Sequence, residues 1–479
     1  MRSPLGRTRI ATRHRASSLS GARHLLALFL GSCASVPLPT IETAPARPHI
    51  VMIVADDLGW GDVGFHGSEI ETPHLDALAS RGVRLEQFYV QPVCSPTRGA
   101  LLTGRYPLRL GLQCGVVRPW SSHGLPLDER TLANALSEAG YATALCGKWH
   151  LGHARPEYLP TRRGFEQQYG LYNGAIDYWT HRRDGGLDWH ANDRALREEG
   201  YATELLANAA IDMLAAHDHA RPLFLYLPFN APHSPLQAPE ESIAAYAHIA
   251  DKQRRIYAAM VASLDGAIGR ILRALPEHGF AAEETLVFFC SDNGGLRQFG
   301  SNGELRGGKG QLYEGGLRVP AVIAWPGHLE AGGIVNEPLH AVDLYPTLLR
   351  LAGASAEQAK PVDGEDCWPV LTAGAKTPHE LLVHNLTPWS GALRSGNWKL
   401  VQNGAVPANA IEGPPRDTWE LFHLGEDPGE RNDRSRDEPE RMRAMRERLE
   451  ALRREAAPPV LSPNVAPEGF RAPEIWGES

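Results

Sequence analysis

Ile50-Val51-Met52-Ile53-Val54-Ala55-Asp56-Asp57 is the segment that says most about the architecture of this chain. Its first six residues form an unbroken apolar run that is rich in β-branched side chains. Such a run predicts a strand buried on both faces, which is typical of a parallel sheet covered by helices. The two aspartates would then lie at the carboxyl end of the strand, where open α/β sheets bind their ligands.

Downstream of this segment, strand-length apolar runs alternate with helix-length amphipathic runs. The further predicted strands are residues 141–146, 223–229, 286–290 and 319–325. The predicted helices are residues 73–80, 128–139, 204–216, 249–275 and 340–351. This alternation predicts an α/β fold class, with a large mixed, mostly parallel sheet sandwiched by helices.

The pattern changes after residue 375. Short strand-like pieces at 381–384, 398–401 and 420–422 are joined by turns, and a charged helix is predicted over 438–455. We therefore expect a smaller C-terminal antiparallel sheet plus helix, packed on the main domain. The predicted boundaries are 48–375 for the main domain and 376–479 for the C-terminal subdomain.

The first 47 residues differ from the rest, with seven arginines, no acidic residue before Glu42 and a short apolar core. This pattern predicts a secretory signal peptide rather than a membrane span. It ends in Leu30-Gly31-Ser32-Cys33, which resembles a bacterial lipoprotein box. We expect a signal peptide with lipobox over 1–33 and a flexible tether over 34–47, and the alternative is an ordinary signal peptide with an incidental cysteine. The protein would be exported to the periplasm or cell surface and held at the outer membrane only through a lipid anchor at Cys33.

Composition excludes one class of partner. The net charge of −8 leaves no broad basic surface, which argues against a nucleic-acid partner, so any anion must be bound by a local site. The six cysteines fit no zinc-ribbon spacing, and we predict no disulfide. Cys146 and Cys290 lie at the ends of predicted strands and are expected in the core.

Polar residues follow four of the predicted strands, at what would be one edge of the sheet. They are Asp56, Asp57, Lys148, His150, His233, Asp292 and Asn293. The three carboxylates and the amide offer only oxygen donors, which suit Ca²⁺ or Mg²⁺ and suit zinc poorly. Taken singly, the Asp56-Asp57 pair could be a helix cap and the Asp292-Asn293 pair a turn. Lys148 and His150 could likewise be a surface lysine and a core histidine.

Three further segments carry candidate chemistry. Cys94, a candidate nucleophile, begins Cys94-Ser95-Pro96-Thr97-Arg98-Gly99, which we place in a loop and in which Arg98 would hold residue 94 by its fork of donors. Lys309 lies in a Gly-rich stretch where the backbone can approach an anion closely. His233 is flanked by prolines and suits a positioned acid. The plain alternatives are a surface salt bridge, a solvated loop and a capped turn.

Cys94-Ser95-Pro96-Thr97-Arg98 matches the C-x-P-x-R signature of type I sulfatases, the formylglycine-dependent members of the alkaline phosphatase superfamily. Four other stretches resemble family motifs: Asp56-Asp57-Leu58-Gly59-Trp60, Leu101-Leu102-Thr103-Gly104-Arg105, Gly147-Lys148-Trp149-His150-Leu151-Gly152 and Ser291-Asp292-Asn293-Gly294-Gly295. The resemblance runs from residue 48 to Asp433. Within the family the chain looks most like arylsulfatase B, the N-acetylgalactosamine-4-sulfatase, on residues 94–111, 159–165 and 233–237.

This resemblance implies a set of site residues. For catalysis they are Cys94, Arg98, Lys148, His150, His233 and Lys309, and for a Ca²⁺ ion they are Asp56, Asp57, Cys94, Asp292 and Asn293. A separate maturation enzyme would convert Cys94 to formylglycine, whose hydrate attacks sulfur while the metal and the two lysines neutralise the sulfate oxygens. His233 would protonate the leaving oxygen, and His150 would deprotonate the second hydroxyl so that sulfate is expelled.

We therefore expect residues 48–375 to be a sulfatase catalytic domain that hydrolyses sulfate monoesters of a sulfated carbohydrate, as in glycosaminoglycan degradation. The alternatives are a phosphomonoester or phosphodiester hydrolase of the same superfamily, and a noncatalytic glycan-binding lipoprotein. One metal site with lysines around the anion favours sulfate, and the complete catalytic set argues against a mere binder. Candidates for sugar contact are Asp177, Tyr178, Trp179 and His181, and the alternative is that they are packing residues. The disulfide cysteines of the animal enzyme have no obvious counterparts here, apart from Cys114.

Overall fold

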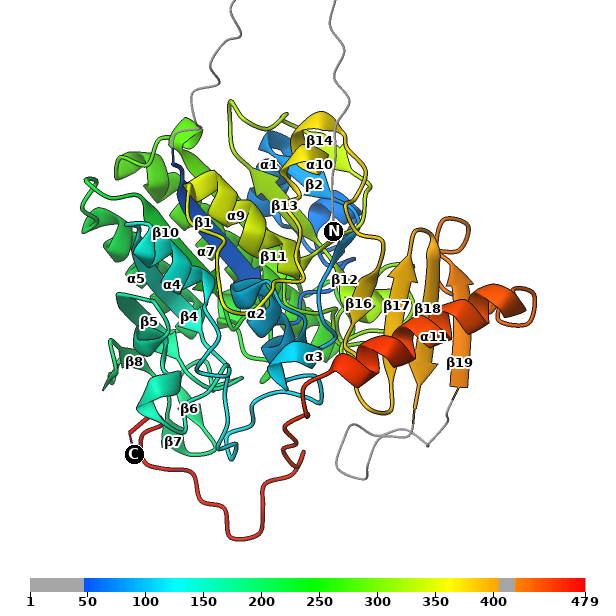
Figure 1. The fold of residues 1–479 in the computed structure, drawn as a ribbon. Helices are drawn as coiled ribbons and strands as arrows, with labels where there is room; N and C mark the ends of the chain where they lie inside the picture. Colours follow the sequence, from blue (N-terminus) through cyan, green and yellow to red (C-terminus); the bar gives the residue numbers. More distant parts are fainter. Residues whose placement is uncertain (1–46, 405–417, 479) are drawn as a thin grey trace, which may run out of the picture. The chain divides into compact units, whose positions relative to one another are not determined.

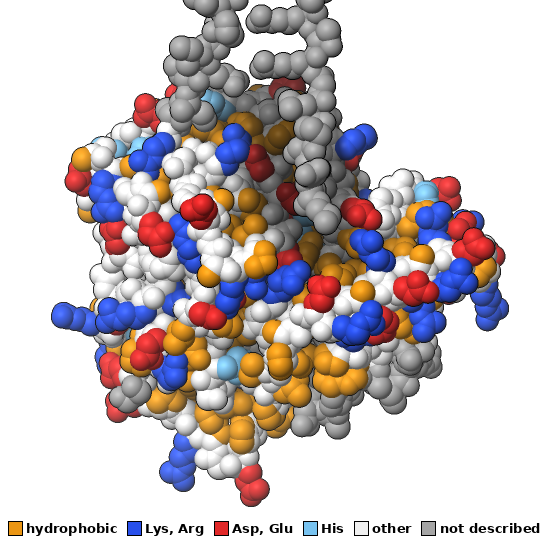
Figure 2. Space-filling view, in the orientation of Figure 1, with side chains coloured by type: hydrophobic (Ala, Val, Ile, Leu, Met, Phe, Trp, Pro, Cys, Tyr) orange, Lys and Arg blue, Asp and Glu red, His pale blue; other side chains and the backbone are white. Residues whose placement is uncertain are grey.

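The computed structural model describes residues 47–404 and 418–478. The predicted signal peptide and most of the predicted tether lie outside these residues. No helix of the described part of the chain is long and apolar enough to cross a membrane. On the face drawn in Figure 2, basic and acidic side chains are interspersed over the described surface.

A ten-stranded sheet forms the centre of the fold, in the order β14-β2-β13-β11-β1-β10-β4-β5-β8-β9. Its middle is parallel and consists of β11 (Thr285–Ser291), β1 (His49–Ala55), β10 (Leu223–Pro228), β4 (Ala142–Lys148) and β5 (Gln167–Leu171). Outside these lie β13 (Ala321–Ala324), β2 (Val83–Leu85), β14 (Gly333–Val335), β8 (His190–Ala191) and β9 (Arg194–Ala195), with antiparallel pairs at β11–β13 and β5–β8. The predicted mixed, mostly parallel sheet is confirmed.

Two hydrophobic cores lie on opposite faces of this sheet, and β1 contributes to both. Val51 and Ile53 pack with α1 (Pro73–Arg81), α5 (Ala202–Ala215) and α7 (Lys252–Glu277). Ile50, Met52 and Val54 pack with α2 (Cys94–Thr103), α4 (Leu132–Glu138) and α9 (Leu344–Ala352). Figure 1 shows the two helical layers around the strands. An apolar run without alternation is what such a doubly covered strand requires.

The C-terminal residues form a separate four-stranded antiparallel sheet, as the sequence predicts. Its strands are β16 (Leu382–His384), β17 (Gly391–Ser395), β18 (Trp398–Asn403) and β19 (Thr418–His423), and α11 (Pro439–Glu455) lies across it (Figure 1). Smaller elements include β3 (Phe88–Tyr89), α3 (Pro107–Leu110), α6 (Glu240–Ala245), α8 (Glu314–Leu317), β12 (Arg318–Val319), β15 (Leu339–His340) and α10 (Trp368–Ala373). The domain boundary at residue 375 stays a prediction.

Several predicted elements need correction. Cys94 is the first residue of α2 rather than part of a loop, because Pro96 is tolerated in the first turn of a helix, where no backbone partner is needed. The helix predicted over 128–139 begins only at Leu132, where Thr131 and Asn134 form a capping box. Pro320 divides the strand predicted over 319–325 into β12 and β13. The helix predicted from residue 340 begins later, because His340 still belongs to β15.

His340 gives a testable consequence of burial in this fold. Its side chain is fully buried and its Nδ1 accepts a hydrogen bond from Val342 N at 3.2 Å. Burial, with a smaller repulsion from His379, lowers the pKa of His340 to about 3. In the unfolded chain the pKa is about 6.5, so below that pH the unfolded state binds the extra proton and stability falls as the pH falls.

We expect His340→Gln to reduce this acid sensitivity. Between pH 6.5 and 5.0, the loss in the free energy of unfolding should be smaller in the variant by about 1.5 kcal/mol. Urea unfolding at the two pH values measures the difference. The exposed His248, replaced by glutamine, serves as the control and should leave the loss unchanged.

Candidate active site

The strand ends bring the predicted polar residues together. Asp56 and Asp57 directly follow β1, and Asp292 and Asn293 directly follow β11, whose Ser291 is in register with Ala55. Lys148 is the last residue of β4, two strands away across β10. All five of these side chains are fully buried. The predicted polar residues therefore meet at the carboxyl edge of the parallel strands, which is the candidate site.

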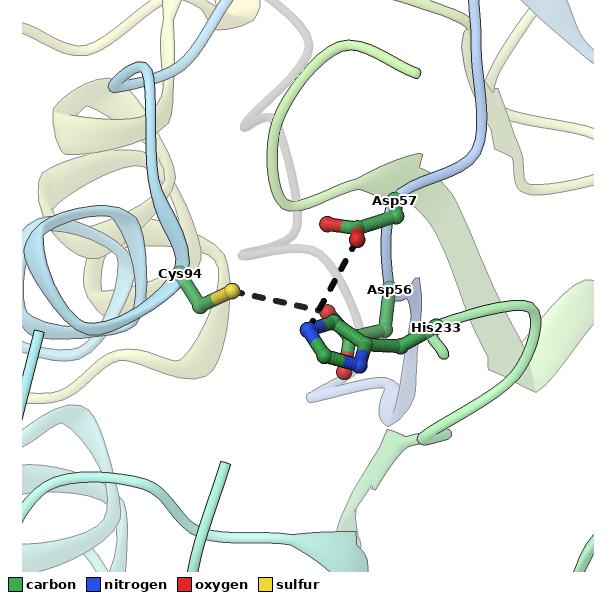
Figure 3. A group of neighbouring side chains, drawn as sticks. All are labelled: Asp56, Asp57, Cys94 and His233. Carbon is green, nitrogen blue, oxygen red and sulfur yellow. Dashed lines mark hydrogen bonds and ion pairs between the residues drawn. The ribbon is translucent and has the colours of Figure 1, made fainter. Parts of the chain in front are cut away.

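Cys94 faces this edge from the first turn of α2. Its Sγ lies 3.5 Å from Asp56 Oδ1 and 3.5 Å from Asn293 Oδ1. Figure 3 shows Cys94 pointing toward Asp56 beside Asp57 and His233. Burial, followed by the carboxylate of Asp292, raises the pKa of the Cys94 thiol to about 12. An unmodified Cys94 is therefore protonated at neutral pH, which argues against a direct thiolate nucleophile.

Two lysine ammonium groups form ion pairs with the two aspartates that follow β1. Lys148 Nζ lies 2.5 Å from Asp56 Oδ2, and Lys309 Nζ lies 2.6 Å from Asp57 Oδ1. Burial disfavours the charge on Asp57, but Lys309 and His233 outweigh it and hold its pKa below the usual range. Burial and the repulsion from Asp292 raise the pKa of Asp56 above the usual range, despite Lys148. A further positive charge near Asp56 would therefore be favourable.

The donor set fits a hard divalent cation. Ligand atoms of Asp56, Asp57, Cys94 and His233 all lie within 4.8 Å of one another. Asn293 borders this group, since its Nδ2 donates to Asp57 Oδ1 at 2.8 Å. The available ligands are mostly oxygens, which suit Ca²⁺ or Mg²⁺. Three carboxylates here face three cationic side chains, so a divalent cation entering with a sulfate dianion would leave the charge balanced.

Arg98 has different partners from those expected. Its Nη2 and Nε donate to Asp292 Oδ2 at 2.8 and 3.1 Å, and its Nη1 donates to Lys148 O at 2.9 Å. Its fork of donors is therefore directed at Asp292 rather than at residue 94. A fully buried arginine on a fully buried carboxylate fixes the orientation of Asp292, whose Oδ1 accepts the Asp57 N–H at 3.3 Å.

The surroundings of both candidate histidines disfavour the protonated form. Burial and then the charge of Lys309 lower the pKa of His233 to about 3, although its Nε2 lies 3.6 Å from Asp57 Oδ2. Burial and then Lys148 lower the pKa of His150 well below its usual range. His150 Nε2 is 3.0 Å from Val117 O, while its buried Nδ1 has no partner among the described residues. A bound anion between the lysines would offset the cationic charge and raise both pKa values.

The four candidates for sugar contact separate into two kinds. Tyr178 is buried, with its hydroxyl 2.6 Å from Asn230 O and 2.8 Å from His233 O, so it holds the segment that carries His233. His181 is buried and stacks on Trp189. Asp177 accepts a hydrogen bond from Gln237 Nε2 at 2.7 Å, and Trp179 is exposed. Of the four, only Trp179 has an exposed ring, and that ring is tilted against the ring of Tyr201 at a centroid distance of 5.1 Å.

Sequence reasoning did not single out the side chains that support Asp57 from behind. Tyr257, on α7, lies with its hydroxyl 3.1 Å from Asp57 O and 2.9 Å from Asp62 Oδ2, and Arg254 pairs with Asp62 at 2.6 Å. The only available signal was Asp62 itself, a third aspartate close to the first two. The tyrosine and arginine lie far along the chain, on a helix whose pattern predicts no more than a core face.

A mixed, mostly parallel sheet with a buried cluster of paired charges at its carboxyl edge defines the class: an α/β protein whose candidate site lies where such sheets bind their ligands. The Sulfatase family model matches residues 48–354. Arylsulfatase J from Mus musculus is 37% identical over 460 residues, covering 86% of this chain and 77% of that protein. N-acetylgalactosamine-6-sulfatase from Canis lupus familiaris is 33% identical, covering 81% of this chain and 82% of that protein.

Solved structures agree with the sequence comparisons. The crystal structure of Ps i-CgsB in complex with k-i-k-neocarrahexaose superposes with a TM-score of 0.78 at 34% identity, over 86% of this chain and 94% of that chain. PsFucS1 sulfatase from Pseudoalteromonas sp. gives a TM-score of 0.73 at 28% identity, over 86% and 92%. The chain belongs to the sulfatase family and is a sulfuric ester hydrolase. The family resemblance is confirmed, while the particular likeness to arylsulfatase B stays a prediction.

Proposed function

We propose that this enzyme hydrolyses sulfate monoesters of a sulfated carbohydrate, of the N-acetylgalactosamine-4-sulfate kind, in the degradation of glycosaminoglycans or similar polymers. The observation that carries the proposal is the placement of Cys94 among Asp56, Asp57 and Asn293, with Lys148 and Lys309 on the carboxylates. Relatives named as N-acetylgalactosamine-6-sulfatases and a neighbour bound to a neocarrahexaose support a carbohydrate substrate.

Two groups complete the proposed site. Asp56, Asp57, Asp292, Asn293 and residue 94 would hold Ca²⁺, which polarises the sulfate and offsets its charge. Oxidation of Cys94 to formylglycine by a maturation enzyme would supply an aldehyde, and its hydrate would carry one hydroxyl able to attack sulfur and a second able to drive sulfate release. A cysteine sulfate ester would lack that second hydroxyl.

The chain's own side chains do the remaining work. Lys148 and Lys309 bind the sulfate oxygens and stabilise the charge that grows on them in the transition state. His233, beside Asp57, gives a proton to the leaving oxygen once the bound anion has raised its pKa. His150 removes the proton whose loss releases sulfate. Arg98 keeps Asp292 aligned.

The same fold also carries phosphoester chemistry, since a phosphonate monoester hydrolase of Agrobacterium radiobacter has a TM-score of 0.63 at 21% identity. That degree of identity speaks for the fold alone. A noncatalytic glycan-binding lipoprotein is the other candidate, and the complete set of six catalytic candidates argues against it. The test is a panel of sulfated monosaccharides and glycosaminoglycan oligosaccharides, with released sulfate as the readout. Release from galactosamine sulfates is expected, and release from none of the sulfated sugars would contradict the proposal.

The organisation of the chain belongs to the same proposal. Residues 48–375 would be the catalytic domain and residues 376–479 the C-terminal subdomain. Export would follow from the signal peptide over 1–33, with an outer-membrane anchor if Cys33 is lipidated. Mass spectrometry of the secreted protein tests both the cleavage site and the state of Cys94.

We expect activity to depend on a divalent ion. A calcium chelator should lower sulfate release to the background, because removing the ion leaves no metal to offset the charge of the sulfate. Calcium should restore more activity than zinc, since every predicted protein ligand is an oxygen donor once Cys94 has become formylglycine. Full activity after exhaustive chelation and dialysis, with the metal content measured, would contradict the metal site.

A further inference from the structure

A buried ion cluster joins the C-terminal sheet to the main domain. Lys399, on β18, places its Nζ 2.9 Å from Glu314 Oε1 and 2.8 Å from Glu430 Oε1, and all three side chains are fully buried. The hydroxyl of Tyr89, on β3, donates to Glu314 Oε2 at 2.6 Å. The backbone N–H of Glu314 donates to Glu430 Oε2 at 2.6 Å. The first residue of α8 is thus held from several sides.

This cluster is not expected to add much to the free energy of unfolding. Taking three charges out of water is costly, and apolar replacements of such clusters are often equally stable or more so. Ionic contacts do fix geometry, because each charge must meet its partner at one distance and direction. The cluster therefore serves to hold α8 in a defined place.

α8 packs directly against the backbone of the candidate active site. Gly294, next to Asn293, donates its N–H to Gly316 O at 3.2 Å, and a Cβ on Gly294 would lie 1.8 Å from Gly315 O. Gly315 donates its N–H to Arg306 O at 2.7 Å. Contacts between glycine backbones leave no side chain to absorb a shift, so a displacement of α8 reaches Asn293.

The segment just before α8 carries Lys309 and contacts Pro92, two residues before Cys94. Lys309 N donates to Gly295 O at 3.2 Å, and Gly310 N donates to Pro92 O at 2.8 Å. Leu312 packs in one hydrophobic cluster with Val401 and Phe422 of the C-terminal sheet. The C-terminal sheet and the Lys309 loop are therefore in contact both through ions and through apolar side chains.

We propose that Lys399 is a positioning residue of the active site: through Glu314 it fixes α8, and α8 in turn fixes Asn293 and the ammonium of Lys309. The C-terminal sheet is thereby a working part of the sulfate site rather than an appendage. The inference rests on the proposed role of Lys309 in binding the sulfate oxygens.

The test compares Lys399→Met with Lys376→Met, a matched control whose ammonium pairs with Glu337 at 2.8 Å but is 88% exposed. The first readout is inhibition of aryl sulfate turnover by inorganic sulfate, because an inhibition constant does not depend on the fraction of folded enzyme. Lys399→Met should weaken sulfate inhibition by roughly tenfold. The reason is that a shift of α8 would displace Lys309 and cost its hydrogen bond to the charged sulfate. The control should leave inhibition unchanged.

The second readout is amide hydrogen exchange of residues 306–316, which needs no activity. Exchange should be about tenfold faster in Lys399→Met than in the wild type and in the control. If Lys399→Met does not fold, Lys399→Met with Glu430→Gln removes one charge of each sign, and the same results are expected of it. Unchanged sulfate inhibition together with unchanged exchange overturns the inference. Absence of ester turnover in the wild type would instead overturn the proposed function. The exchange result would still test whether Lys399 positions α8.

Discussion

Replacing Cys94 with alanine is expected to lower the turnover of an aryl sulfate by a factor on the order of 10⁵, the scale seen when a nucleophile is removed. Residue 94 is the only group of the cluster that can become an attacking hydroxyl. Its unmodified thiol, with a pKa raised to about 12, cannot substitute at neutral pH. Initial rates with a chromogenic aryl sulfate measure the loss.

The fold should survive this change. Cys94 is buried, but the side chain is small and its Sγ makes only contacts of 3.5 Å, so the free energy of unfolding should change by no more than about 1–2 kcal/mol. Cys114→Ala is the matched control, because Cys114 is also a free cysteine, lies outside the cluster and should be dispensable. Activity retained in Cys94→Ala would end the formylglycine account.

Arg98→Ala is expected to be the most destabilising single change in the site. It would leave Asp292 buried without its counter-ion, next to Asp56, and breaking a buried pair in this way costs about 3–5 kcal/mol. Activity should fall as well, because the proposed metal ligand Asp292 would lose its alignment. The midpoint of urea unfolding and the aryl sulfate rate are the two measurements.

Arg155→Ala controls for loss of an arginine in general. Arg155 pairs with Glu157 at 3.6 Å, but both side chains are more than half exposed, so the expected cost is under about 1 kcal/mol. An Arg98→Ala variant no less stable than Arg155→Ala would show that the buried pair contributes nothing, against the arrangement described here.

The sheet and its carboxyl edge could be predicted because their signals are local. The apolar run before Asp56 can be buried on both faces only in a covered sheet, and parallel strands place their ends together without further information. The pairing of Lys148 with Asp56 and of Lys309 with Asp57 is not part of this local signal and comes from the structure.

Other features depend on contacts between distant segments, which no local pattern encodes. The local pattern directs Arg98 to residue 94, four positions away, whereas the fold pairs it with Asp292, which follows the carboxyl end of β11. Lys399 looks like an ordinary strand lysine until Glu314 and Glu430 meet it. Proline and small polar residues around Cys94 suggest a loop, although the first turn of a helix tolerates the same residues.

The most direct test of the central claim uses purified, matured, calcium-loaded protein and compares an aryl sulfate with the corresponding aryl phosphate. The proposed site, with one metal position and two lysines around a formylglycine at residue 94, predicts a higher kcat/KM for the sulfate. Faster cleavage of the phosphate ester would contradict this account of the site.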